Sequence, residues 1–138
     1  MLHDCLGRFY LTSDLWTSLT SYGYIRVIAH FVDEHWVLQK RVLNFSFMAQ
    51  PHNGVSLCEK MYNMIKEWGI KNKLLSITLD NASSNDVFVK LLRHQLNIKN
   101  ALVCFGEFFH LYCCAYILNL IVHDDLKEID GTLQKIRD

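Results

Sequence analysis

The sequence predicts one α/β domain built on a mixed β-sheet. Three strand-like runs come first, and helical and strand-like segments then alternate. The 138 residues suit a single domain, and a hydrophobic share of 51% is sufficient for a core. Strands joined by short turns pair antiparallel, whereas a strand that follows a crossover helix normally runs parallel to a neighbour. We therefore expect a sheet of mixed direction with helices on its faces.

The first half of the chain predicts an antiparallel meander. Residues 8–18, 24–33 and 36–47 are rich in aromatic and β-branched side chains, which favours strands. Turn-forming residues separate these runs at 20–23 and 33–35. Because both connections are short, each strand should pair with the next.

A helix and a buried strand are expected next. Apolar residues at helical spacing predict a helix over residues 55–68, and Gly69 lies where a helix-ending glycine belongs. Residues 73–80 form a short apolar run that is typical of a buried strand. Because this strand follows a helix, we expect it to run parallel to a partner in the sheet.

The alternation continues with a second helix and a further strand. The helix is predicted over residues 84–96, with Val87, Leu91 and Leu92 on one apolar face. A strand is expected around residues 101–111. The candidate N-caps of the helix are Ser83, Ser84 and Asn85.

A long final helix should run from Cys114 or Ala115 toward Ile136. Residues 115–122 form the longest apolar stretch of the chain, and eight residues are too few to span a bilayer. We therefore expect no membrane association. Candidate interruptions of the helix are Asp124, Asp125 and Gly131.

Two aspartates stand out as candidate functional residues. Asp14 lies inside the strand-like run 11–18, and Asp80 ends the strand-like part of residues 75–85. Burying a carboxylate among apolar side chains is costly unless it binds something. If the two runs are neighbours in the sheet, the carboxylates come together and suit a divalent metal and phosphoryl transfer. Asp14 as a solvent-facing edge residue and Asp80 as part of a capping loop are the simpler alternatives.

The net charge, the cysteine count and the N-terminus bear on DNA binding and on the cellular compartment. The formal net charge is zero, which argues against autonomous DNA binding because free-standing DNA-binding domains are usually basic. The five cysteines are an odd number. The N-terminus lacks the basic start and apolar core of a signal peptide. These features indicate a reduced intracellular compartment.

The cysteines and tryptophans are expected to be structural. Cys113 and Cys114 are adjacent, so they do not give the paired spacing of a zinc site, and we predict no zinc in this chain. Burial as small apolar side chains is the expected state of the cysteines. Trp36 and Trp68 are expected to serve in packing.

Six stretches of the chain resemble the N-terminal part of the catalytic domain of hAT-superfamily transposases, especially plant RICESLEEPER-type proteins with a BED zinc finger. The first reads Leu-Thr-Ser-Asp-Leu-Trp-Thr-Ser. The resemblance implies an incomplete RNase H-like domain over residues 1–138. It also implies that the BED finger, the helical insertion and the C-terminal dimerisation region are absent. The six stretches are residues 11–18, 28–33, 36–41, 67–70, 78–85 and 117–121.

The resemblance also implies roles for three residues. Asp14 and Asp80 match the first two acids of the family's Asp-Asp-Glu triad, and would be Mg²⁺ or Mn²⁺ ligands. Trp16 matches an aromatic residue that stacks on a flipped base of DNA, which is physically reasonable for an unstacked base. Because Trp16 lies two residues after Asp14, both should point to the same face of the sheet.

The chain departs from the family pattern in its second half. The third acid, a glutamate, belongs beyond the end of this chain, and Glu107 and Glu128 do not fit its position. Cys113 matches a family cysteine. Tyr112 and Tyr116 stand where arginine and histidine are usual.

We therefore expect a transposase-derived fragment that does not cleave DNA by itself. Its ancestor would cleave and transfer DNA strands in the nucleus, with protein partners or further copies bound through the missing regions. The alternative is a domesticated nuclear module that associates with DNA or protein without catalysis. A stand-alone nuclease, with Asp124 and Asp125 as further acids, is the least favoured hypothesis.

Overall fold

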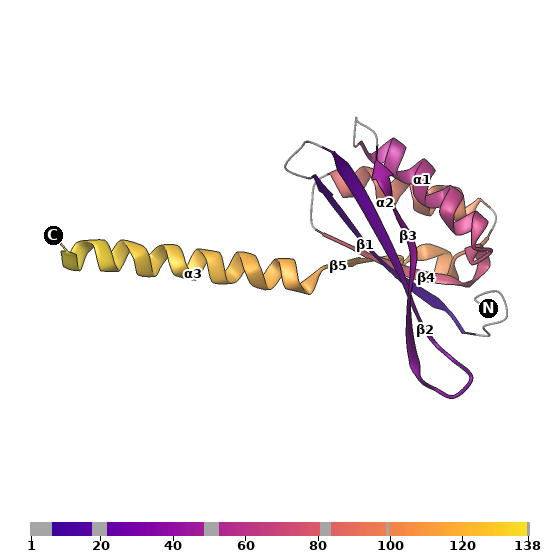
Figure 1. Cartoon of the computed structure of the whole chain (residues 1–138), viewed down its shortest axis with the longest axis horizontal. Helices are drawn as coiled ribbons and strands as arrows, with labels where there is room; N and C mark the ends of the chain where they lie inside the picture. The colour runs from indigo at the N-terminus through magenta and orange to yellow at the C-terminus, as the bar shows by residue number, and fades with distance from the viewer. Residues whose placement is uncertain (1–6, 18–21, 49–52, 81–83, 99, 138) are drawn as a thin grey trace.

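The computed structural model describes residues 7–17, 22–48, 53–80, 84–98 and 100–137. Within these ranges the chain forms a five-stranded sheet with the strand order β3-β2-β1-β4-β5. The helices α1 (Gly54–Glu67) and α2 (Ser84–Asn97) lie against one face of this sheet, and α3 (Cys114–Arg137) projects away from it (Figure 1). The predicted α/β class with a mixed sheet is confirmed.

The first three strands form the predicted antiparallel meander. They are β1 (Phe9–Thr17), β2 (Gly23–Val32) and β3 (Leu38–Met48). In β1 and β2, Asp14 lies opposite Arg26, and the register between β2 and β3 shifts at a bulge after Val27. The bulge adds a residue to one strand only and therefore increases the local twist.

The turn between β2 and β3 is built around Asp33. Its carboxylate accepts hydrogen bonds from the backbone N–H of His35 and of Val37, both at 2.9 Å, and from the Gln39 amide at 2.7 Å. Trp36 adopts a left-handed φ of 62° at this turn and is 89% exposed. The expectation that Trp36 packs was therefore wrong, because the turn directs it into solvent.

The helix α1 (Gly54–Glu67) crosses from β3 to β4. The Asn53 side chain caps it by accepting from the Val55 and Ser56 amides at 3.1 and 2.9 Å. Gly69 has a φ of 66°, so it ends the helix as predicted.

The strand β4 (Leu74–Leu79) follows a short 3-10 turn, η2 (Lys71–Lys73), and pairs in parallel with β1. This confirms the expected direction. Trp68, which follows α1, donates its indole N–H to the Leu43 carbonyl of β3 at 3.0 Å. This bond holds the indole against β3, although the side chain expected to pack is 42% exposed.

The helix α2 (Ser84–Asn97) has a different buried face from the predicted one. Phe88, Leu92 and Leu96 are almost fully buried, whereas Val87 and Leu91 are exposed. Only Leu92 of the predicted face is therefore correct. Of the candidate N-caps, Ser83 lies outside the described residues.

The strand expected around residues 101–111 was predicted too long. Within this segment the strand is limited to β5 (His110–Tyr112), which pairs in parallel with β4. The preceding residues form a 3-10 turn, η3 (Val103–Gly106), in which Cys104 and Phe105 have left-handed φ values of 49° and 53°. A strand cannot continue through two such residues.

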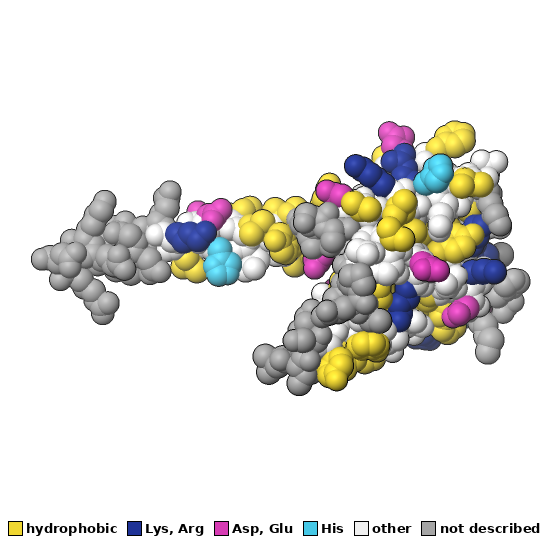
Figure 2. All heavy atoms as spheres, turned by 90° about the horizontal axis from the view of Figure 1, so that it is seen from above, with side chains coloured by type: hydrophobic (Ala, Val, Ile, Leu, Met, Phe, Trp, Pro, Cys, Tyr) yellow, Lys and Arg dark blue, Asp and Glu magenta, His cyan; other side chains and the backbone are white. Residues whose placement is uncertain are grey.

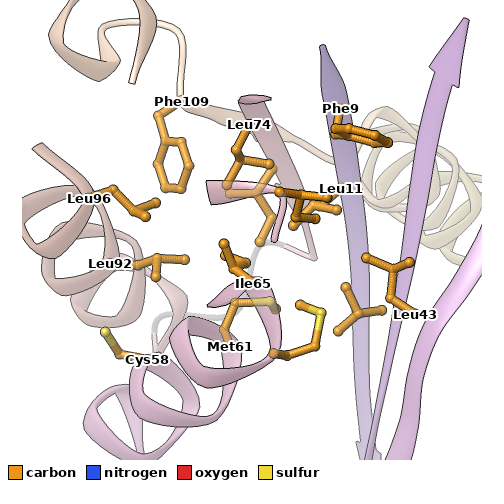
Figure 3. Packing of buried hydrophobic residues seen from close by; sticks show 14 of the residues in the cluster. Phe9, Leu11, Leu43, Cys58, Met61, Ile65, Leu74, Leu92, Leu96 and Phe109 are labelled. Carbon is orange, nitrogen blue, oxygen red and sulfur yellow. The ribbon is translucent and has the colours of Figure 1, made fainter. Parts of the chain in front are cut away.

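The core lies between the sheet and the two packed helices. Figure 3 shows Met61 and Ile65 of α1 and Leu92 of α2 pointing toward Leu11 and Leu74 of the sheet. The opposite face of β1–β3, here called the open face, carries exposed side chains instead. They include Tyr10, Trp16, Val42, Phe45 and Phe47.

The helix α3 (Cys114–Arg137) is continuous, so the expected interruptions do not occur. It leads away from the sheet, and Figure 2 shows hydrophobic side chains along its first half. Leu118, Ile121 and Val122 are each at least half exposed. No helix in the described ranges is long and apolar enough to cross a membrane.

Candidate active site

The parallel pairing of β1 and β4 brings the two candidate aspartates to the same end of neighbouring strands. Thr12 pairs with Thr78. Asp14 and Asp80 each lie two residues further along. The carboxyl edge of parallel strands is where α/β proteins commonly bind ligands. The predicted adjacency of the two strands is confirmed, and the role of the aspartates as metal ligands stays a prediction.

Asp14 is held by an ion pair on the open face. Its Oδ2 accepts from Arg26 Nε at 3.2 Å and makes a closer contact with Arg26 Nη2. The two side chains are 54% and 45% exposed, so solvent and ions reach both. A cation that binds Asp14 would therefore compete with the Arg26 guanidinium.

Asp80 is held from the other direction, by the first turn of α2. The buried Asn85 amide donates to the Asp80 backbone carbonyl at 2.8 Å and also contacts its carboxylate. Sequence reasoning treated Asn85 only as a candidate N-cap. Its position five residues after Asp80, at the start of a predicted helix, was the available signal for this contact.

A small hollow lies beside Asp80 on the helix-covered side of the sheet. Asp80 and Asn85 belong to its lining together with Ser13, whereas Asp14 does not. Alternation along β1 explains the difference, because Ser13 and Asp14 point to opposite faces. The remaining lining is apolar: Leu15, Ile25, Leu57, Met61, Leu79 and Phe88.

Trp16 lies on the open face with Asp14, as predicted. It is 39% exposed, and its ring stacks on Tyr24 with centroids 6.0 Å apart. Phe45 of β3 approaches the same ring at 5.7 Å. Sequence reasoning did not connect Tyr24 and Phe45 with Trp16, because their contact depends on the register of β1, β2 and β3.

The other candidate acids lie elsewhere. Glu107 is exposed after η3, and the side chain of Glu128 lies outside the described part of the chain. Asp124 pairs with Lys127 at 3.2 Å on α3, which runs away from the sheet in Figure 1. Asp124 and the adjacent Asp125 are therefore placed away from Asp14 and Asp80.

The cysteines have varied surroundings. Burial raises the pKa of the Cys58 thiol, which keeps it neutral, and its Sγ lies 3.8 Å from Gln95 Oε1. Cys104 and Cys114 are exposed, so the expectation of burial was wrong for these two. Cys113 is half-buried, and Cys5 lies outside the described residues.

His110 lies in β5 and pairs with Ile77 of β4. Burial lowers its pKa, so the ring is neutral at physiological pH, and its buried Nε2 has no hydrogen-bond partner in the described ranges. Among the residues that the structure describes, no three His, Cys, Asp or Glu side chains gather in a way that could hold a metal ion.

Comparison with known proteins places this architecture in a family. The family described as the ZBED1 RNase-like domain matches residues 12–108. No solved structure matches. The chain is 39% identical to the putative AC transposase of Zea mays over 137 residues, and 38% identical over 133 residues to the BED zinc finger protein RICESLEEPER 2 of Oryza sativa subsp. japonica. It is 34% identical over 122 residues to DAYSLEEPER of Arabidopsis thaliana.

These matches cover most of this chain but a small part of each relative. The matches to the putative AC transposase, RICESLEEPER 2 and DAYSLEEPER cover 99%, 96% and 88% of this chain. They cover 17%, 18% and 17% of the length of those relatives. The RNase-like family agrees with the RNase H-like order of three antiparallel strands followed by alternating helices and strands. The chain therefore belongs to the ZBED1 RNase-like domain family and is related to the hAT-type transposases.

Proposed function

We propose that this chain is a transposase-derived part of an RNase H-like catalytic domain whose ancestral reaction is DNA strand cleavage and transfer. The observation that carries the proposal is the placement of Asp14 and Asp80 beyond the paired Thr12 and Thr78. Carboxylate oxygens are the ligands that Mg²⁺ and Mn²⁺ prefer, so the donor chemistry fits such ions.

The residues present have distinct proposed roles. Two divalent ions, when bound, would activate a water or 3′ hydroxyl and offset the charge of an in-line phosphoryl transfer. Asp14 and Asp80 would hold them, and Asn85 would fix the Asp80 carboxylate. Arg26 opposes this use of Asp14 because its guanidinium already neutralises the carboxylate.

We propose that the chain by itself does not cleave DNA. Asp14 and Asp80 are two thirds of the triad that the family resemblance implies, and neither Glu107 nor Glu128 matches its glutamate. Because the Arg26 guanidinium pairs with Asp14, less negative charge is available to bind a second divalent ion. The test is nicking of supercoiled plasmid by the purified chain with Mg²⁺ or Mn²⁺. Metal-dependent nicking that Asp14→Ala abolishes would show that the chain is an active nuclease.

The ancestral metal site needs a readout that does not depend on activity. We expect Mn²⁺ to broaden the NMR signals of amides around residues 13–15 and 79–80 before others. Asp80→Ala should remove this effect, whereas Asp86→Ala, at an exposed acid of α2, should leave it unchanged. Uniform broadening, or equal effects of both substitutions, would rule out the site.

A non-catalytic module is the second candidate function. It is favoured by the Asp14–Arg26 ion pair, which uses the carboxylate structurally, and by the zero net charge. The relatives are named as transposases and BED zinc finger proteins, so we propose nuclear, DNA-associated surroundings for this chain too. As such a module, the chain would bind a protein partner or further copies of itself. Pull-down from nuclear extract, compared with the nicking assay, separates the two candidates.

A further inference from the structure

The hollow beside Asp80 contains three polar groups from three parts of the fold. Ser13 belongs to β1, Asp80 follows β4, and Asn85 lies in the first turn of α2. Ser13 is only 6% exposed and Asn85 only 7%, so both side chains are more than nine-tenths buried. Buried polar groups are almost always hydrogen-bonded, because leaving them without a partner destabilises the folded state.

Two of these groups have hydrogen-bonding capacity that the described residues do not use. The Ser13 hydroxyl lines the hollow and makes no hydrogen bond with any described residue. The Asn85 amide nitrogen donates to the Asp80 backbone carbonyl at 2.8 Å and contacts the Asp80 carboxylate. Its Oδ1 receives no hydrogen bond from the described part of the chain. The hollow therefore presents one hydroxyl donor, one amide acceptor and one carboxylate.

The size and the walls of the hollow restrict what can occupy it. Its volume of about 10 Å³ is close to the space that one water molecule needs. The other six residues of the lining are apolar, so a second water would find no polar partner there. A divalent cation such as Mg²⁺ usually retains several waters and therefore needs more room.

We propose that the hollow binds one ordered water molecule that links Ser13 to Asp80 and Asn85. The water accepts from the Ser13 hydroxyl and donates to Asn85 Oδ1 and to the Asp80 carboxylate. These three bonds are the usual number for a buried water, and they satisfy all three protein groups. A water bridge is nearly as favourable as a direct hydrogen bond, so Ser13 is a positioning residue for the Asp80 carboxylate.

This inference deepens the proposed function. A partner that orients a ligating carboxylate raises the affinity of the site for metal, although it does not touch the ion. Ser13 and Asp14 are adjacent in β1 and point to opposite faces, so β1 would supply one ligand and the support of the other. The effect on metal affinity rests on the proposed function, whereas the water site does not depend on it.

The water is tested by NMR of the isotope-labelled whole chain in EDTA. A rotating-frame Overhauser cross-peak, opposite in sign to chemical exchange, should connect water with the Asn85 side-chain amide protons. Ser13→Ala should remove this cross-peak and move the ¹³C shift of the Asp80 carboxyl carbon. Ser76→Ala is the matched control, because Ser76 is a serine of the neighbouring strand β4, is 3% exposed and does not line the hollow.

The outcomes of this experiment separate clearly. Loss of the cross-peak and a moved carboxyl shift in Ser13→Ala alone support the proposal, provided that both variants melt like the parent chain. A parent chain without the cross-peak overturns it, whether or not Ser13→Ala folds. A cross-peak that survives in Ser13→Ala, an unchanged Asp80 carboxyl shift, or equal effects of Ser76→Ala also overturn it.

The link to metal binding is measured separately by Mn²⁺ calorimetry. Ser13→Ala should weaken Mn²⁺ binding about twofold to tenfold, the range expected for one hydrogen bond, and Ser76→Ala should not. Unchanged Mn²⁺ affinity in Ser13→Ala would show that Ser13 does not position Asp80. A parent chain that does not bind Mn²⁺ contradicts the proposed function instead, because the water site is measured without metal.

Discussion

At the scale of single residues, the contacts of Asp14 and Asp80 differ more than their matched positions in the strands suggest. Asp14 is neutralised by Arg26, a neighbour across β1 and β2. Asp80 is fixed by Asn85, which comes from the following helix. Both aspartates could be singled out from the sequence, because Asp14 lies within a strand-like run and Asp80 lies at the end of one. The sequence did not predict their partners, which depend on the cross-strand register and on the start of α2.

Replacing Arg26 should release Asp14. Arg26→Gln removes an ion pair between two half-exposed side chains, so the free energy of unfolding should fall by only about 0–1 kcal/mol. Mn²⁺ binding, measured by calorimetry, should become tighter because the competing cation is gone. Arg41→Gln, at an exposed arginine of β3, is the control. Unchanged or weaker Mn²⁺ binding in Arg26→Gln would mean that Asp14 is not a ligand.

The ionised Asp33 carboxylate should stabilise the folded chain, and this stabilisation should be lost when acid protonates it. Hydrogen bonds from the Val37 backbone and the Gln39 amide lower the pKa of the Asp33 carboxyl below its usual value. A carboxyl whose pKa is lowered by folding stabilises the folded state above its unfolded pKa, and this contribution is lost as the pH falls through the folded value. Urea unfolding should be measured at decreasing pH from about pH 6. The free energy of unfolding should fall less in Asp33→Ala than in the parent chain. Glu67→Gln, at an exposed acid, should retain the parent profile.

At the scale of elements, sequence patterns predicted where most helices and strands lie, but not always which face of an element is buried. The meander, α1 and β4 follow from alternation, helical spacing and the turn residues between them. The face of α2 was misjudged because Val87 and Phe88 are both apolar, and only the packing against α1 selects Phe88. The strand around residues 101–111 was predicted too long because Cys104 and Phe105 show no sign of left-handed backbone in the sequence.

The junction of α1 and α2 provides a prediction at this scale. A Cβ at Gly54 would lie 2.8 Å from the Phe88 backbone nitrogen and 2.9 Å from Val87 Cβ. Because the clash involves backbone, Gly54→Ala should force the helices apart and cost about 1–3 kcal/mol of unfolding free energy. Chemical denaturation measures this loss. Val55→Ala, next in α1 and 61% exposed, should change stability far less; equal losses would contradict the close approach.

At the scale of the whole molecule, α3 is a helix without a described packing partner. Its first half exposes apolar side chains, whereas an isolated helix gains little stability unless such side chains are packed. The sequence predicted this helix and its apolar composition. It did not predict that the helix leads away from the sheet, because direction is set by the chain around β5 (Figure 1).

The exposed surface of α3 should drive association. We expect sedimentation velocity to show mass that rises with protein concentration. Leu118→Gln and Ile121→Gln, at residues 61% and 52% exposed, should reduce this rise without changing the melting of the sheet domain. Lys127→Gln, at a charged residue of the same helix, is the control. A monomer at every concentration would show that α3 is stable without a partner.

The position of β3 at the border of the sheet has a further consequence for folding in a crowded cell. An outer strand leaves one row of backbone N–H and C=O groups free to pair with a strand of another molecule. Lys40 and Arg41 lie within β3 and are both exposed. A second β3 approaching in register would bring like charges together, so these two residues oppose growth of the sheet into a fibril.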